Sequence, residues 1–311
     1  MNGIFEVNYA AFSIFAALLI TEIMGAVVLL VAWPARNKVL GYAVPVWEIT
    51  GTFGAFWVVT GGFAYPALLV PVASIFAPLL VVFLLLWVAR SSSIAFSEFI
   101  TKRRWLDDAK LYKAYAVSTI LIGLVVLILL SSLVGGQGVN LSSGSFSIIS
   151  WITAGNLAFV LGTLLLGVGL APVFFDLESL RRVVLPLAGV GVVLSVFSYW
   201  LMSPGLLTPT ITLPVILTLL AGSLYLWPKT KSVVTNKAVF LVVLSTIIFS
   251  LQPLVYPKVI GQALAIDAVT TGGAMADAFV SVTLVGGLLL ALMLALYMRI
   301  ATRGPAGPDV P

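Results

Sequence analysis

Long apolar stretches follow one another along almost the whole chain. A stretch of about 20 apolar residues is long enough to cross the hydrocarbon core of a membrane as a helix. Nine such stretches can be marked, and they cover residues 10–33, 44–67, 71–89, 113–135, 147–172, 183–203, 208–227, 236–256 and 278–301. The pattern therefore predicts an all-α polytopic membrane protein with about nine transmembrane helices. We expect one integral membrane domain over residues 1–303 and a disordered Pro/Gly-rich tail over 304–311.

The overall composition leads to the same class. Hydrophobic residues make up 61% of the 311 residues and charged residues only 9%, whereas a soluble domain has about 25% charged residues. A soluble fold needs polar residues to cover its surface, so the solvent around most of this chain must be lipid. The net charge of +5 does not indicate nucleic-acid binding, because the basic residues are spread over short connections.

Lysine and arginine side chains fall almost entirely on alternate connections between the apolar stretches. Lys258 alone lies on the opposite side, and the basic residues of the first set are Arg36, Lys38, Arg90, Lys102, Arg103, Arg104, Lys110, Lys113, Arg181, Arg182, Lys229, Lys231, Lys237, Arg299 and Arg303. Cytoplasmic connections carry an excess of Lys and Arg. The distribution therefore predicts an N-terminus outside and a C-terminus inside.

The chain contains no histidine and no cysteine. It therefore lacks the usual ligands of zinc and haem, and it can form no disulfide. Histidine is also the side chain best suited to proton transfer near neutral pH. We expect no cofactor and no metal on this chain, and any acid–base chemistry must fall to carboxylates.

Three carboxylates occur within or next to the apolar stretches. Glu22 lies halfway along the first, where an ionised carboxylate costs several kcal/mol unless it faces the bundle interior or a partner. It is either a proton-relay or quinone-site carboxylate, or a neutral side chain bonded to a neighbouring helix. Glu48 opens the second stretch, and we expect it near the inner membrane boundary. Asp277 begins the last stretch, where a carboxylate is favoured by the helix dipole.

Four glycines lie on the second stretch, at Gly51, Gly54, Gly61 and Gly62. Small residues let transmembrane helices approach closely, so we expect a packed neighbour along this face. Tyr65-Pro66 and Pro71 follow, and they predict a tight turn before the third stretch.

The second and third stretches resemble subunit II of cytochrome bd-type quinol oxidases. The resemblance lies in Trp47-Glu48, in Trp57 followed by Gly61-Gly62, and in Tyr65-Pro66, and then in Arg90 with the later Phe96 and Glu98. Glu22 stands where that family carries an acid-rich segment. The sequence also departs from the family: Glu48 replaces the usual Asp, the Asn after it is missing, and the Gly-rich element is shorter. The chain is thus similar to a divergent member.

The resemblance implies a specific architecture and role. Family members fold as two four-helix bundles plus a peripheral helix, here about residues 10–135, 147–256 and 278–301. Haems b and d belong to a partner, subunit I, which oxidises quinol and reduces dioxygen to water. Subunit II is not catalytic alone. It supplies packing and a proton path from the inner side, for which Glu48 matches the family acid, Trp47 its neighbour, and Glu22 a further acid.

The family context also implies a location and a set of partners. The location is a prokaryotic cell membrane, and the partners are subunit I, small single-helix subunits, lipid and quinone, with no nucleic acid. Three other classes remain open on the sequence alone. They are a quinone-facing membrane anchor of the polysulfide-reductase type, a secondary transporter and a purely structural membrane scaffold. Transporters have internal repeats, and no clear repeat is found here.

Overall fold

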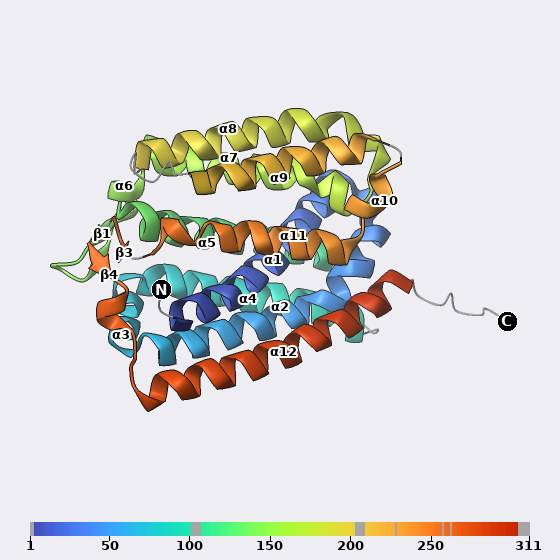
Figure 1. The fold of residues 1–311 in the computed structure, drawn as a ribbon. Coiled ribbons are helices and arrows are strands. Elements are labelled where there is room, and N and C mark those ends of the chain that lie inside the picture. Colours follow the sequence, from blue (N-terminus) through green and yellow to red (C-terminus); the bar gives the residue numbers. More distant parts are fainter. Residues whose placement is uncertain are drawn as a thin grey trace.

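Long helices lie side by side along one common direction in the computed structural model (Figure 1). The structure describes residues 3–100, 107–202, 209–227, 229–256, 258–261 and 263–303. The predicted tail at 304–311 lies outside these ranges. The helices are α1 (Gly3–Val31), α2 (Arg36–Ala64), α3 (Pro66–Ile75), α4 (Ala77–Phe99), α5 (Asp108–Gly135), α6 (Ile148–Trp151), α7 (Ala154–Phe174), α8 (Val184–Met202), α9 (Pro209–Leu226), α10 (Lys231–Val234), α11 (Lys237–Ser250) and α12 (Ala274–Arg303).

Short elements gather at the two ends of the helices. Two antiparallel hairpins, β1 (Val139–Asn140) with β2 (Ser145–Phe146) and β3 (Lys258–Val259) with β4 (Leu264–Ala265), lie together at one end (Figure 1). The 3-10 turns cover Trp33–Ala35, Glu178–Val183, Gln252–Leu254 and Asp267–Val269. We call the end with the two hairpins the hairpin end. We call the opposite end the basic end, because α10 and most of the lysines lie there.

The helices confirm a multi-pass membrane protein. Among the described residues, seven helices are long and apolar enough to cross a membrane, or up to eight if the bent pair of α2 and α3 forms one span. Each of the nine predicted stretches overlaps a long helix, and the third and fifth stretches also include part or all of the shorter helices α3 and α6. The count of nine spans, the orientation of the termini and the division into two bundles stay predictions.

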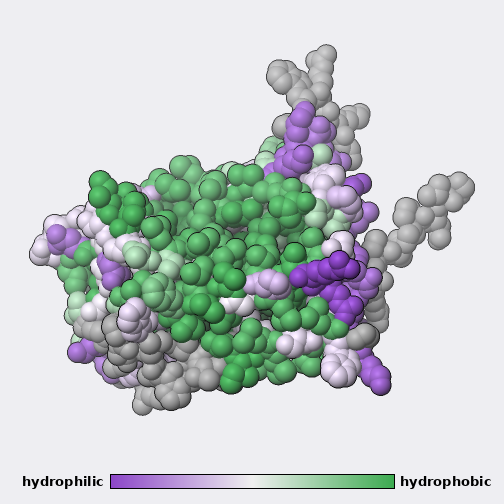
Figure 2. Space-filling view, turned by 90° about the horizontal axis from the view of Figure 1, so that it is seen from above, coloured by the Kyte–Doolittle hydropathy of each residue, from purple (hydrophilic) through white to green (hydrophobic). Residues whose placement is uncertain are grey.

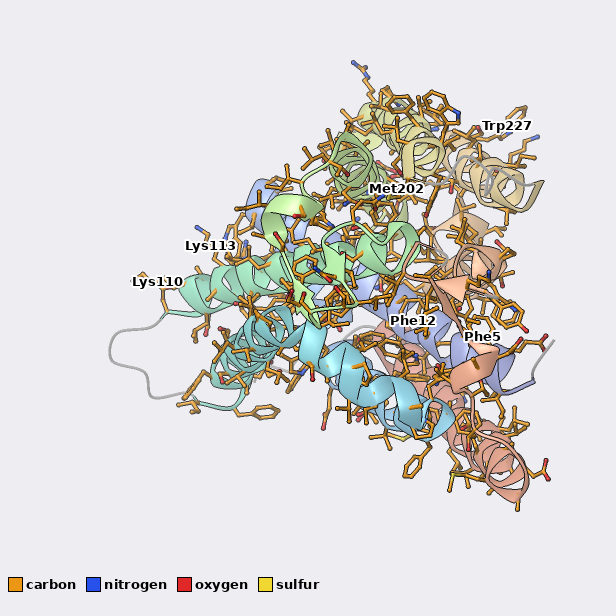
Figure 3. All side chains as sticks on the ribbon, turned by 90° about the vertical axis from the view of Figure 1, so that its left-hand side faces the viewer. Phe5, Phe12, Lys110, Lys113, Met202 and Trp227 are labelled. Carbon is orange, nitrogen blue, oxygen red and sulfur yellow. The ribbon has the colours of Figure 1, made fainter. Side chains whose placement is uncertain are left out.

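Helix α1 lies at the centre of the packing. It contacts α2, α5, α7, α11 and α12, and 61% of the residues in its most apolar segment are buried, against 11% for α4. A helix that is apolar on every side is expected to lie inside a bundle or in lipid. Helix α1 lies inside the bundle. Figure 3 looks along the helices from the hairpin end and shows Phe12 among the surrounding helices, while Lys110 and Lys113 lie at the periphery.

The outer surface has the pattern of a lipid-facing protein. A broad apolar band covers the middle of the molecule, and hydrophilic side chains gather mainly at the basic end (Figure 2). Much of the exposed apolar surface comes from α4 and α12, including Leu84, Leu85, Leu288 and Leu289. Water-exposed helices would carry polar residues on this face, so lipid or another membrane protein must cover it.

The chain turns sharply between the second and third predicted stretches, as expected. Helix α2 ends at Ala64 and α3 begins at Pro66, and the two helices are bent by 119° relative to one another. The sequence did not predict that α3 is a separate helix, with Pro71 inside it. Pro66 is the first residue of α3 and Pro78 the second of α4. Proline is favoured in the first turn of a helix because its missing N–H would have no intrahelical partner there. Pro66 and Pro78 therefore start helices here, and the predicted third span begins at Ala77 rather than at residue 71.

Candidate functional site

The centre of the site is a buried ion pair between α1 and α4. Arg90 Nη2 donates a hydrogen bond to Glu22 Oε2, and neither side chain is exposed. The prediction that Glu22 faces the bundle interior is confirmed. Its partner was not foreseen, because Arg90 was counted among the inner connections. Helix α4 continues nine residues beyond it to Phe99, so Arg90 is part of the packed bundle.

Two further helices complete the site. The Tyr115 hydroxyl on α5 donates to Glu22 Oε2 at 3.1 Å, and Arg90 Nη2 lies 3.4 Å from the Trp47 carbonyl oxygen on α2. The guanidinium also lies 4.7 Å from the centre of the Trp87 ring, which is within cation–π range. The ion pair therefore ties α1, α2, α4 and α5 together at one depth.

The hydrogen-bonding capacity of the pair is not fully used. Glu22 Oε1 and the Nε and Nη1 atoms of Arg90 are buried and make no hydrogen bond to the described part of the chain. Buried polar atoms in proteins nearly always have a partner, which can be water or a ligand.

A second polar contact lies one residue from Glu22. The hydroxyls of Thr21 and Tyr42 are 2.7 Å apart, and both side chains are completely buried. The Tyr42 ring packs against Phe174 of α7 with ring centres 4.7 Å apart. This contact extends the polar site between α1, α2, α4 and α5 toward α7.

Glu48 does not join Glu22 and Arg90. Its side chain is exposed, whereas Ile49 and Thr50 beside it are buried. The expectation that Glu48 lies near the inner membrane boundary stays a prediction. Helix α2 begins at Arg36, so Glu48 lies about 18 Å along the helix axis. It sits beside Trp47, whose carbonyl faces Arg90. Glu48 is therefore at the same depth as the buried pair, on an outer surface of this chain.

The remaining motif residues serve packing and helix connection. Trp57 packs on Phe12 and Phe15 of α1, with ring centres 4.9 and 5.8 Å away. Glu98, near the end of α4, is exposed and accepts a hydrogen bond from the Tyr112 hydroxyl of α5. Asp277 lies in the first turn of α12, as expected for a carboxylate near a helix N-terminus.

The glycines of α2 fit the predicted close approach at one position only. A Cβ on Gly54 would lie 2.8 Å from the Phe15 ring of α1. At Gly51, Gly61 and Gly62 an added Cβ would lie 3.6 Å from the nearest side chain, which is ordinary contact distance. Gly54 therefore sets the spacing of α1 and α2, and the other three are not required for it.

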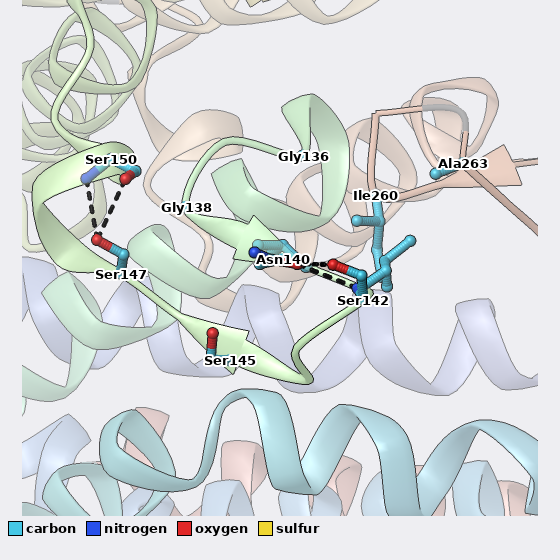
Figure 4. A pocket seen from close by; sticks show the side chains of 11 residues that line it. Gly136, Gly138, Asn140, Ser142, Ser145, Ser147, Ser150, Ile260 and Ala263 are labelled. Carbon is cyan, nitrogen blue, oxygen red and sulfur yellow. Dashed lines mark hydrogen bonds between the residues drawn. The ribbon is translucent and has the colours of Figure 1, made fainter.

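A polar pocket of about 540 Å³ lies at the hairpin end (Figure 4). Asn140 Oδ1 accepts hydrogen bonds from the backbone and hydroxyl of Ser142, and Ser147 accepts from Ser150. The residues that line this pocket include no titratable side chain. The described residues also contain no group of three His, Cys, Asp or Glu side chains able to hold a metal.

Comparison with known proteins bears on the fold. No protein-family model and no curated protein matches the sequence. Among solved structures, the chain is similar to one in the structure of bd oxidase from Geobacillus thermodenitrificans. The TM-score is 0.70 with 20% sequence identity, and the match covers 96% of this chain and 97% of the other. The chain has a fold found in a bd oxidase. The resemblance noted in the sequence is confirmed at the level of the fold.

Proposed function

We propose that this chain is the haem-free subunit II of a bd-type quinol:dioxygen oxidoreductase in a prokaryotic cell membrane. The observation that carries the proposal is the match to a bd oxidase chain over almost the full length of both chains. The sequence lacks histidine, so the haems b and d would be bound by a partner, subunit I. Neither the membrane-anchor nor the transporter interpretation gains support from the comparisons.

The position of Glu48 supports a partner subunit. An ionised carboxylate at membrane depth costs several kcal/mol when it faces lipid. Glu48 is exposed at the depth of the Glu22–Arg90 pair, so burial against a second membrane protein would remove this cost if the partner offers a hydrogen-bond donor or a water-filled passage. The apolar faces of α2, α4 and α12 next to it would form the rest of that interface.

Proton transfer gives the carboxylates their roles in the proposal. Quinol oxidation releases electrons and protons, and dioxygen takes up electrons and protons to become water. The protons consumed at the oxygen-reducing centre must enter from water. Glu48 would accept a proton from the inner side and pass it to the partner.

Glu22 would have a positioning role beside this path. Its Oε2 is bonded to Arg90 and Tyr115. Loss of its negative charge would leave Arg90 as an uncompensated buried charge, which is costly. We therefore assign Glu22 the role of holding Arg90 in place, with Glu48 as the carboxylate that carries the proton.

Purification from native membranes tests the proposal. A tag on this chain should bring down a histidine-containing membrane partner, and the complex should show b-type and d-type haem absorption. The chain expressed alone should show neither. Stoichiometric haem on the isolated chain, or a native complex without haem, would contradict the proposal. Quinol-dependent oxygen consumption that is lost on removal of this chain would complete the test.

A further inference from the structure

A second pocket lies at the basic end, between the start of α2, the end of α7 and the start of α11. Its volume is about 300 Å³, and it is lined by Lys38, Phe174, Phe175, Asp176, Thr235 and Lys237. Phe174 forms its inner wall against Tyr42. The pocket is thus built from three helices that are far apart in the sequence.

Two lysines face this pocket without a carboxylate partner. Lys38 Nζ donates to the Asp176 main-chain oxygen at 2.8 Å, and Lys237 Nζ lies 5.4 Å from the centre of the Tyr42 ring. No carboxylate in the described ranges comes within 4 Å of either ammonium group. A backbone oxygen and an aromatic face satisfy a cation only in part.

The only carboxylate that lines the pocket is already engaged. Lys231 Nζ lies 2.7 Å from an oxygen of Asp176 and 2.7 Å from one of Glu178. Hydrogen bonds to these two carboxylates raise the pKa of Lys231 above its ordinary value. Both carboxylates are therefore bound to Lys231, and the cluster of three lysines and two carboxylates keeps a net positive charge, with Lys38 and Lys237 as the lysines that have no carboxylate within 4 Å.

The backbone at Asp176 is held in an unfavourable conformation. Its φ is 49°, in the left-handed region that non-glycine residues seldom adopt. This turn aims the Asp176 carbonyl at Lys38 and the carboxylate at Lys231. Strained residues of this kind are concentrated at binding sites, where the surrounding structure maintains them.

We propose that this pocket binds the phosphate group of an anionic ligand, with Lys38 and Lys237 as its two cations. Basic pockets between transmembrane helices at the headgroup level bind the phosphates of acidic lipids, and a free phosphate offers the same oxygens. Lysine donates charge-assisted hydrogen bonds to phosphate. The inference is independent of the oxidase assignment and of the orientation of the chain, because the basic end meets a headgroup layer in either case.

Native mass spectrometry of the purified, delipidated protein with its co-purifying partners tests the proposal. The probes are phosphatidylglycerol, zwitterionic phosphatidylcholine and inorganic phosphate, each added alone. One phosphate-bearing anion should bind, and the double variant Lys38→Gln/Lys237→Gln should weaken its binding by about tenfold or more. Uptake of phosphatidylglycerol over phosphatidylcholine that millimolar phosphate does not displace identifies a lipid headgroup. Saturation by inorganic phosphate alone identifies a free anion.

Matched variants keep the proposal falsifiable. Lys113→Gln/Lys229→Gln removes the same charge from exposed positions at the same end and should leave the affinity within about twofold of wild type. Lys38→Arg and Lys237→Arg preserve the charge and should retain binding. Retained binding in these variants would show that the loss in the double Gln variant comes from the missing charges and not from misfolding. Equal weakening in both double variants, or no binding of either anion to the wild type, would overturn the proposal.

Discussion

The Arg90 guanidinium on α4 donates a hydrogen bond to the Glu22 carboxylate on α1, and both side chains are fully buried. A buried charge without its partner is far more costly than a buried pair. We therefore expect Glu22→Gln and Arg90→Gln each to destabilise the protein by about 3–5 kcal/mol. The double variant should lose less than the sum of the two. Thermal unfolding in detergent measures all three.

The control for the Glu22 and Arg90 variants is Asp277→Asn, which removes an exposed carboxylate at the start of α12. Its loss should be below about 1 kcal/mol, the usual size of a helix-dipole effect. Additive losses in the double variant would show that the two side chains do not stabilise each other.

Glu48→Gln tests proton transfer in the assembled complex. The substitution keeps the size and hydrogen bonding of the side chain but removes its titrating proton. Assembly and haem content should be retained, while quinol-dependent oxygen consumption should fall severalfold or more. Glu48→Asp should retain much of the activity, because a carboxylate remains at the same position.

The Glu48 result is compared with two other carboxylates. Asp277→Asn should leave turnover unchanged, and Glu22→Gln should act mainly by lowering the amount of folded complex. Normal turnover in Glu48→Gln would remove the proposed proton path through this chain. A specific loss of turnover in fully folded Glu22→Gln would move that path to α1.

The end of α5 and the β3–β4 turn meet at a pair of glycines, Gly136 and Gly261, and this contact predicts the effect of a Cβ. Gly136 has φ 75°, and a Cβ on it would lie 3.0 Å from the backbone nitrogen of Gly261. Gly136→Ala should therefore destabilise the protein through backbone strain of about 1 kcal/mol and a clash of about 1–3 kcal/mol. Gly144 has φ 61° but open space around it, so Gly144→Ala should show the strain alone. Equal melting temperatures of the two variants would argue against the glycine contact.

The natural absence of cysteine makes the orientation directly measurable. Ser143 lies in the β1–β2 hairpin and Ser232 in α10, and both are exposed. Since the basic end is expected inside, a membrane-impermeant thiol reagent added to intact cells should label Ser143→Cys and not Ser232→Cys. Ser232→Cys should react only after the membrane is opened. Labelling of Ser232→Cys alone in intact cells would reverse the orientation.

The apolar pattern of the chain was enough to predict a multi-pass membrane protein and the approximate positions of its long helices. Apolar length is a local property, and a stretch long enough to cross lipid must satisfy its backbone by forming a helix. The sequence also required an interior position for Glu22, since a carboxylate in the middle of an apolar helix cannot face lipid without a large cost. Its lack of histidine and cysteine already limited the available chemistry.

Which side chains meet could be seen only once the helices were packed together. Glu22 and Arg90 are 68 residues apart, and Lys38 and Lys237 come together from the starts of α2 and α11. Such contacts depend on how far each helix is rotated about its own axis. Helices such as α1 and α7 are apolar all round, so no apolar stripe in their sequences specifies that rotation. The packing of small and large side chains between helices, as at Gly54 and Phe15, sets it instead. The same packing leaves the Glu48 side chain on the outer surface of the helix bundle and buries the Glu22 side chain inside it.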